Sequence, residues 1–135
     1  MKTAIVLLIC LVLLPGCTHT AGPQAIAVPT AEVTPGITVP EKHITATAQK
    51  IDPARILVTY NGGPDADQLI ELETTVINNK GSVTIQSMGS RLDTTPVKSG
   101  GTDMIKGPFS GQVHVIITGY FFNGTHQDIL ETWIQ

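Results

Sequence analysis

Apolar and polar residues alternate along the chain from about residue 42 to its end, and this alternation limits what the chain can fold into. A period of two is the period of a strand that places one face on a core, whereas a helix requires a period of 3.6. The apolar positions are therefore expected to face inward. The alternating segments are 44–48, 56–60, 70–76, 83–86, 113–122 and 129–134. The last two are apolar at both alternating positions, so we expect them to be central strands.

Turn-forming residues separate these segments, and Asn-Gly is the strongest short hairpin signal. They are Asp52-Pro53, Asn61-Gly62-Gly63-Pro64, Asn78-Asn79-Lys80-Gly81 and Asn123-Gly124. Residues 88–111 are less regular and have room for one or two short edge strands, near Thr95–Lys98 and Asp103–Lys106. The pattern predicts an all-β fold, an immunoglobulin-like antiparallel β-sandwich of about seven strands over residues 42–135. A small β-barrel is the alternative.

The N-terminal segment is typical of a lipoprotein signal peptide. Lys2 precedes the apolar run Ala4–Leu14, and Pro15-Gly16-Cys17 follows. The run is much shorter than the roughly 20 residues of a transmembrane helix. We expect residues 1–16 to be removed and Cys17 to become the lipid-modified N-terminus. A soluble secreted product is the alternative. Cys10 would leave with the signal peptide, so the mature domain would contain neither a thiol nor a disulfide.

Residues 17–41 predict a lipid-anchor site followed by an extended linker. Prolines recur among Thr, Ala and Gly at positions 23, 29, 35 and 40, a composition typical of a partly polyproline segment. Its threonines are candidates for O-linked sugar, and an unmodified flexible stalk is the alternative. The net charge of the whole chain is −3. Because no basic stripe is present, nucleic acid is excluded as an expected partner, and contact with the membrane is expected through the anchor.

The polar residues do not form a catalytic signature, and we predict no enzyme activity, no metal and no cofactor. The four histidines, which lack the spacing of a metal site, are His19, His43, His114 and His126. Three acidic residues could supply some calcium ligands, but no further acidic run accompanies them: Asp65, Asp67 and Asp103. Glu71 and Glu73 lie about 7 Å apart on one strand face, as in a glycosidase pair, although such neighbours are ordinarily just solvated.

Two further features concern sugar. Tyr120, Phe122 and Trp133 would stack on a carbohydrate if they shared one face of the sheet, and packing in the core of the second sheet or at its edge is the favoured interpretation. Asn123-Gly124-Thr125 is an N-glycosylation acceptor at the tip of a predicted hairpin. We therefore list Asn123 as a candidate modification site.

Some segments carry a family resemblance, and they are Ile44–Ala48, Ile56–Ala66 (ILVTYNGGPDA), and Val113–Gly124 with Asp128–Trp133. They resemble the β-rich C-terminal domain of type IV pilin-like surface proteins of methanogenic archaea. The resemblance covers roughly residues 44–133 and implies display at the cell surface. It gives Gly62, Gly63, Pro64 and Asp65 the role of a turn-forming motif. Pilin-like chains keep a long apolar helix after cleavage, and this chain has none after Cys17.

The sequence therefore predicts a lipid-anchored extracytoplasmic surface protein with a non-catalytic binding or structural role. It would lie at the outer face of the cytoplasmic membrane or in the cell envelope, with envelope or filament proteins as partners. One alternative is an accessory or minor component of a pilus-like filament. A second alternative is a carbohydrate- or ligand-binding module.

Overall fold

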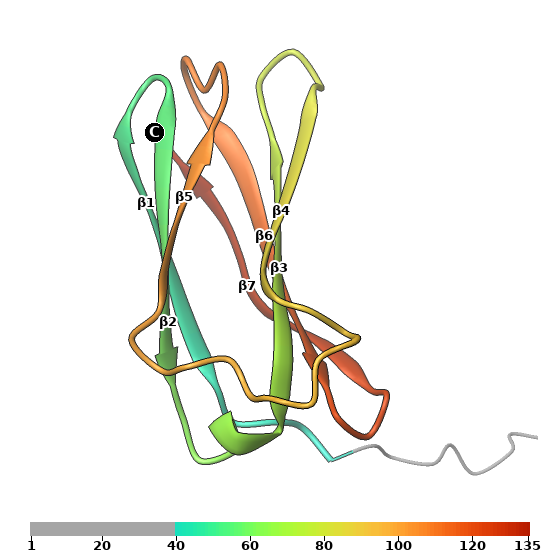
Figure 1. Ribbon diagram of the computed structural model, residues 1–135. Coiled ribbons are helices and arrows are strands. Elements are labelled where there is room, and N and C mark those ends of the chain that lie inside the picture. Colours follow the sequence, from blue (N-terminus) through green and yellow to red (C-terminus); the bar gives the residue numbers. More distant parts are fainter. Residues whose placement is uncertain (1–39) are drawn as a thin grey trace, which may run out of the picture. The chain divides into compact units, whose positions relative to one another are not determined.

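The computed structural model describes residues 40–135 (Figure 1). The predicted signal peptide, Cys17 and the linker up to residue 39 lie outside the described residues. No helix within residues 40–135 has the length and apolar character needed to span a membrane.

Within residues 40–135, seven strands form two antiparallel sheets. The first sheet has the order β1-β2-β5 and consists of β1 (Thr45–Asp52), β2 (Arg55–Gly62) and β5 (Thr102–Lys106). The second has the order β4-β3-β6-β7 and consists of β3 (Leu69–Ile77), β4 (Val83–Gly89), β6 (Val113–Phe121) and β7 (His126–Ile134). A short 3-10 helix, η1 (Ala66–Gln68), connects β2 to β3.

This architecture confirms the predicted all-β antiparallel sandwich. In the constant-type immunoglobulin arrangement the fourth strand joins the sheet of the first, second and fifth strands. Here β4 pairs with β3 instead. The immunoglobulin-like subclass therefore stays a prediction.

The core lies between the two sheets and is built from alternate residues of the strands, as the period of two predicts. In β6, Val113, Val115 and Ile117 are fully buried while the residues between them are half-buried on the outer face. The other fully buried side chains include Ile56, Val58, Tyr60, Leu69, Leu72, Val76, Ile105, Phe109 and Phe121. The sandwich therefore depends on a single apolar layer between its sheets.

The inward face of β4 is the opposite of the expected one. Val83 and Ile85 are 56% and 60% exposed, whereas Thr84 and Gln86 are half-buried. Pairing with β3 sets this orientation, because Ile85 lies opposite the outward-facing Thr75. Side chains directly opposite one another point to the same face of a sheet, so Ile85 is carried outward.

One other expectation, the central position of the last strand, is wrong. β7 is an edge strand rather than a central one. Its register with β6 shifts between Ile117 and Thr118, so Ile129 is an extra residue and both Ile129 and Leu130 pack against the core. That bulge explains the apolar run at both alternating positions. In the less regular stretch, the strand expected near Asp103–Lys106 is present as β5, and Thr95–Lys98 forms no strand.

Candidate functional site

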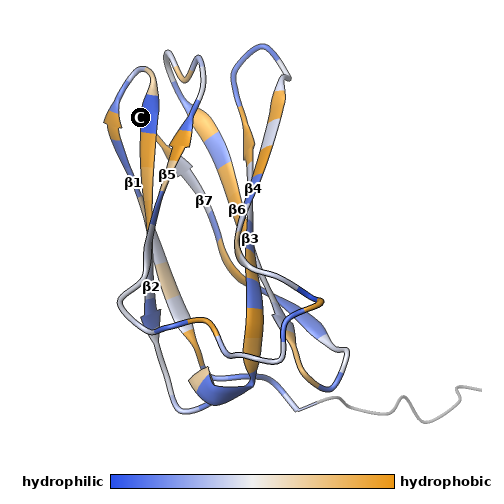
Figure 2. Cartoon of the chain, viewed as in Figure 1, coloured by the Kyte–Doolittle hydropathy of each residue, from blue (hydrophilic) through white to orange (hydrophobic). Residues whose placement is uncertain are grey.

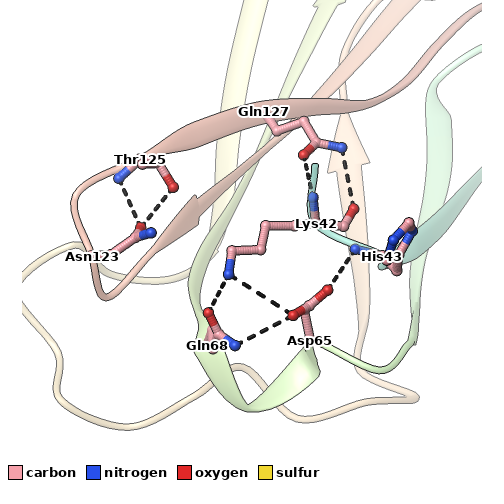
Figure 3. Close-up of polar contacts among 7 residues, drawn as sticks. All are labelled: Lys42, His43, Asp65, Gln68, Asn123, Thr125 and Gln127. Atoms are coloured by element: carbon pink, nitrogen blue, oxygen red, sulfur yellow. Dashed lines mark hydrogen bonds and ion pairs between the residues drawn. The ribbon is translucent and has the colours of Figure 1, made fainter. Parts of the chain in front are cut away.

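The segment that enters the sandwich before β1 is held from two sides, by side chains that come from distant parts of the chain (Figure 3). We call this arrangement the entry clamp; it consists of Lys42, His43, Asp65, Gln68 and Gln127. Asp65 Oδ2 accepts a hydrogen bond from the His43 backbone N–H at 2.7 Å. Gln127 Oε1 accepts one from the Lys42 N–H at 2.8 Å, and Gln127 Nε2 donates to the Lys42 carbonyl at 3.2 Å. Both sides of the entering backbone are thereby fixed.

The side chain of Lys42 strengthens the same contact. Its ammonium group lies 3.9 Å from Asp65 Oδ1 and also donates to Gln68 Oε1. It lies 5.9 Å from the centre of the Phe121 ring. Lys42 and Asp65 are both largely buried, with side-chain exposures of 13% and 21%. This partly desolvated ion pair is therefore expected to contribute more to the stability of the fold than an ion pair on an open surface.

The glycines of the predicted motif allow the β2–β3 connection to approach the entering chain. Gly63 has a φ of +154°, and a Cβ at that position would lie 2.2 Å from the His43 carbonyl oxygen. Any larger residue would push the chain away. The Asp65 carboxylate accepts a hydrogen bond from the backbone N–H of His43, 22 positions earlier, so the motif binds the incoming chain as well as making a turn.

Sequence reasoning missed Lys42, Gln68 and Gln127 as partners of the motif. Lys42 and Gln127 are separated by 85 positions, and neither belongs to a recognisable motif. Only the strand arrangement, which brings the start of β7 beside the start of β1, places them together. The carboxylate, amides and ammonium of the entry clamp all contact other groups of the protein itself.

Glu71 and Glu73 are committed to a second polar network. Glu71 is 8% exposed, and its carboxylate accepts hydrogen bonds from Ser87 Oγ and from the Arg91 backbone N–H, both at 2.8 Å. The Arg91 guanidinium lies 2.6 Å from Glu73 and 3.7 Å from the centre of the Tyr120 ring. The expectation of a solvated pair is wrong for Glu71. The two carboxylates attach the loop after β4 to the sheet.

The histidines and aspartates that the structure describes do not gather into a metal site. His19 lies outside the described residues, and His43 enters the clamp through its backbone. His114 contacts Glu131 at 3.0 Å and stacks on Trp133, with ring centroids 4.4 Å apart. Asp103 accepts a hydrogen bond from Gln86, away from Asp65. Within residues 40–135, no three potential ligands of the His, Cys, Asp and Glu types converge.

Tyr120, Phe122 and Trp133 lie outside the core between the two sheets. Phe122 and Trp133 are 46% and 61% exposed, and Tyr120 lies beneath Arg91. Tyr120 is opposite His126 at one end of the β6–β7 ladder, whereas Trp133 is opposite His114 at the other end. Tyr120 and Trp133 therefore do not form a common platform for a sugar.

The N-glycosylation acceptor occupies the β6–β7 hairpin tip (Figure 3). Asn123 is exposed, and its Oδ1 accepts hydrogen bonds from the Thr125 N–H at 3.0 Å and from the Thr125 hydroxyl at 2.6 Å. The contact between Asn and Thr within the acceptor triplet is therefore preformed on an accessible turn.

No protein-family model, curated protein or solved structure matches this chain.

Proposed function

We propose that this chain is a lipid-anchored extracytoplasmic surface protein whose sandwich has a non-catalytic binding or structural role. The observation that carries the proposal is the entry clamp. It fixes the point at which the chain from the predicted anchor at Cys17 joins the folded domain. Such reinforcement suits a domain that is held from its N-terminal side.

The clamp distributes a pull on the chain between the two layers. Asp65 follows β2 of the first sheet, and Gln127 belongs to β7 of the second. Beyond the clamp, β1 pairs with β2 from Thr45 to Asp52. The hydrogen bonds of an antiparallel ladder are perpendicular to its strands, so a pull along β1 strains many of them together. A tethered domain with this arrangement resists unfolding by extraction of its first strand.

The proposed partners are the membrane, through lipid on Cys17, and other proteins of the cell envelope or of a filament. An N-linked sugar on Asn123 would sit on a hairpin at the clamped end of the sandwich. The opposite end, where β3 turns into β4, is free of this modification. We therefore place the binding or structural contacts of the domain away from the tether.

Mass spectrometry of the N-terminal peptide of membrane-isolated protein tests the proposal. We expect a peptide that begins at Cys17 and carries lipid, since two lipid hydrocarbon chains give lasting attachment to a membrane. Cys17→Ser should abolish lipidation and retention in the membrane, whereas Cys10→Ser, within the removed segment, should leave both unchanged. Recovery of a peptide that still contains residues 4–14 from sheared filaments would contradict the proposal and indicate a filament subunit.

A further inference from the structure

The two sheets end in four edge strands, β1 and β5 in the first and β4 and β7 in the second. An edge strand presents open backbone N–H and C=O groups that another strand can pair with. Natural proteins protect such edges with charged residues, prolines, bulges or short length. The four edges of this sandwich differ in that respect.

Three of the edges are protected. β1 carries Lys50 and Asp52, and its register with β2 shifts at two places. β5 is five residues long and carries Asp103 and Lys106. β7 has the bulge described above and three polar residues, His126, Asp128 and Glu131.

β4 has none of these protections. Its sequence, VTIQSMG from Val83 to Gly89, contains neither a charged residue nor a proline. It pairs with β3 without a register shift. Val83 and Ile85 point outward and are more than half exposed. Figure 2 shows hydrophobic bands on β4 at the edge of the sheet. β4 is therefore a regular, uncharged and partly apolar edge.

The outer face of the sheet continues this apolar character inward from the edge. Val83 lies opposite Ile77, which lies opposite His114 and its stacked Trp133. Ile85 lies in a parallel row with Thr75 and Ile116. A strand added beside β4 would pair with its open backbone and cover Val83 and Ile85 with its own side chains. The strand best suited to this place is uncharged and apolar on its outer face.

We propose that β4 is a self-association edge, on which β4 of a second copy pairs antiparallel about a two-fold axis. The second copy is favoured because β4 itself has the chemistry that this edge requires. In an isologous contact the same residues meet on both sides, and β4 opposes no like charges. The same pairing through β7 would bring the acidic residues Asp128 and Glu131 of both copies together. The two four-stranded sheets become one continuous sheet.

This pairing fixes the relative direction of the two copies. β4 begins at Val83, far from the entry clamp, and ends at Gly89, which lies in the same row as His126 near the clamp. Antiparallel pairing therefore places the two entry clamps at opposite ends of the assembly. Self-association through β4 does not depend on the lipid anchor and can fail or succeed independently of the function proposed above.

Sedimentation velocity of the full chain, in an excess of detergent micelles, tests this proposal. We expect a reversible dimer with a dissociation constant between about 1 and 100 µM. The area buried by pairing one strand edge is small compared with a standard interface of roughly 1,600 Å². Ile85→Lys should weaken dimerisation at least about tenfold, since two ammonium groups would then meet near the axis. Gln49→Lys on the protected edge β1 is the matched control and should leave the dimer unchanged. Both substituted side chains are exposed, and circular dichroism verifies folding.

A third variant distinguishes edge pairing from packing of the outer faces. Trp133→Ala, three strands away from the edge, should leave dimerisation unchanged if the copies meet through β4. Loss of dimerisation in Trp133→Ala would overturn the proposal and indicate that the copies pack through their outer faces. A chain that stays monomeric at about 100 µM would also overturn the proposal. This holds even if β4 were found to pair with an extended peptide from another protein. A dimer that Ile85→Lys does not weaken has the same consequence.

Discussion

At the scale of single residues, Tyr60 is the least compensated polar group of the core. Its side chain is fully buried, and within residues 40–135 its hydroxyl has no hydrogen-bond partner. Burial raises the pKa of Tyr60; the nearby Ser99 side chain opposes that rise, without reaching hydrogen-bond geometry, and the charge of Asp67 adds to it. The hydroxyl therefore costs desolvation without a compensating bond.

Tyr60→Phe should raise the free energy of unfolding at pH 7 by about 1 kcal/mol, because it removes this unpartnered hydroxyl. The pKa of Tyr60 is higher in the folded than in the unfolded chain, so the folded state retains the proton longer. The free energy of unfolding therefore does not change with the ionisation of Tyr60 below the unfolded pKa of about 10, and it falls as the pH rises from there through the folded pKa. Tyr60→Phe should remove that loss.

Urea unfolding of both proteins at pH 7 and at about pH 11 measures these effects. A lower stability of Tyr60→Phe at pH 7 would mean that the hydroxyl has a real partner, with Ser99 as the nearest candidate. Tyr120→Phe is the comparison. Its hydroxyl is 3.4 Å from Glu73 and lies at the surface network, so its removal should not stabilise the protein.

At the scale of secondary-structure elements, neighbouring residues of β6 should respond in opposite ways to the same substitution. Val115→Asp should unfold the domain, because an unpaired buried charge costs several kcal/mol against a total stability of about 5–15 kcal/mol. Ile116→Asp on the outer face should cost about 1 kcal/mol, partly through repulsion by Glu131 opposite it. Thermal melts followed by circular dichroism compare the two. Equal losses would contradict the assignment of faces in β6.

The alternation of residues predicted the strands and the inward face of β6, but it could not orient β4. The two faces of Val83-Thr84-Ile85-Gln86 differ only moderately in hydrophobicity. The pairing with β3 decides which face meets the core. The extra residue Ile129 similarly gave β7 an apolar run at both alternating positions, the pattern expected of a central strand, although β7 lies at an edge. Such features depend on register between strands, which composition and periodicity do not contain.

The candidate site was predictable only in part for the same reason. Gly62, Gly63, Pro64 and Asp65 stand out locally because their residue types are those of turns. Their partners Lys42 and Gln127 are ordinary polar residues that become special only when β1 and β7 lie side by side. The sequence therefore pointed to the turn, while the fold alone brought the entering chain to it.

At the scale of the whole molecule, the entry clamp joins the first described residues to both sheets. Asp65→Ala should lower the free energy of unfolding by about 1–2 kcal/mol, because it removes a charge-assisted hydrogen bond and leaves the backbone N–H of His43 without its acceptor. Amide exchange of residues 42–46 should accelerate at the same time. Asp67→Ala, which removes the same charge two positions away on an exposed side chain, is the control and should change neither quantity.

The two halves of the clamp should also be coupled. Asp65 and Gln127 hold adjacent backbone groups from opposite sides, so releasing one allows the chain to move away from the other. The losses of stability in Asp65→Ala and Gln127→Ala should therefore add to more than the loss in the double variant, with an interaction energy of about 0.5–1 kcal/mol. Urea unfolding of the three variants measures this energy. Simple additivity would mean that each sheet holds the entering chain independently, and the clamp would then not act as one device between the two layers.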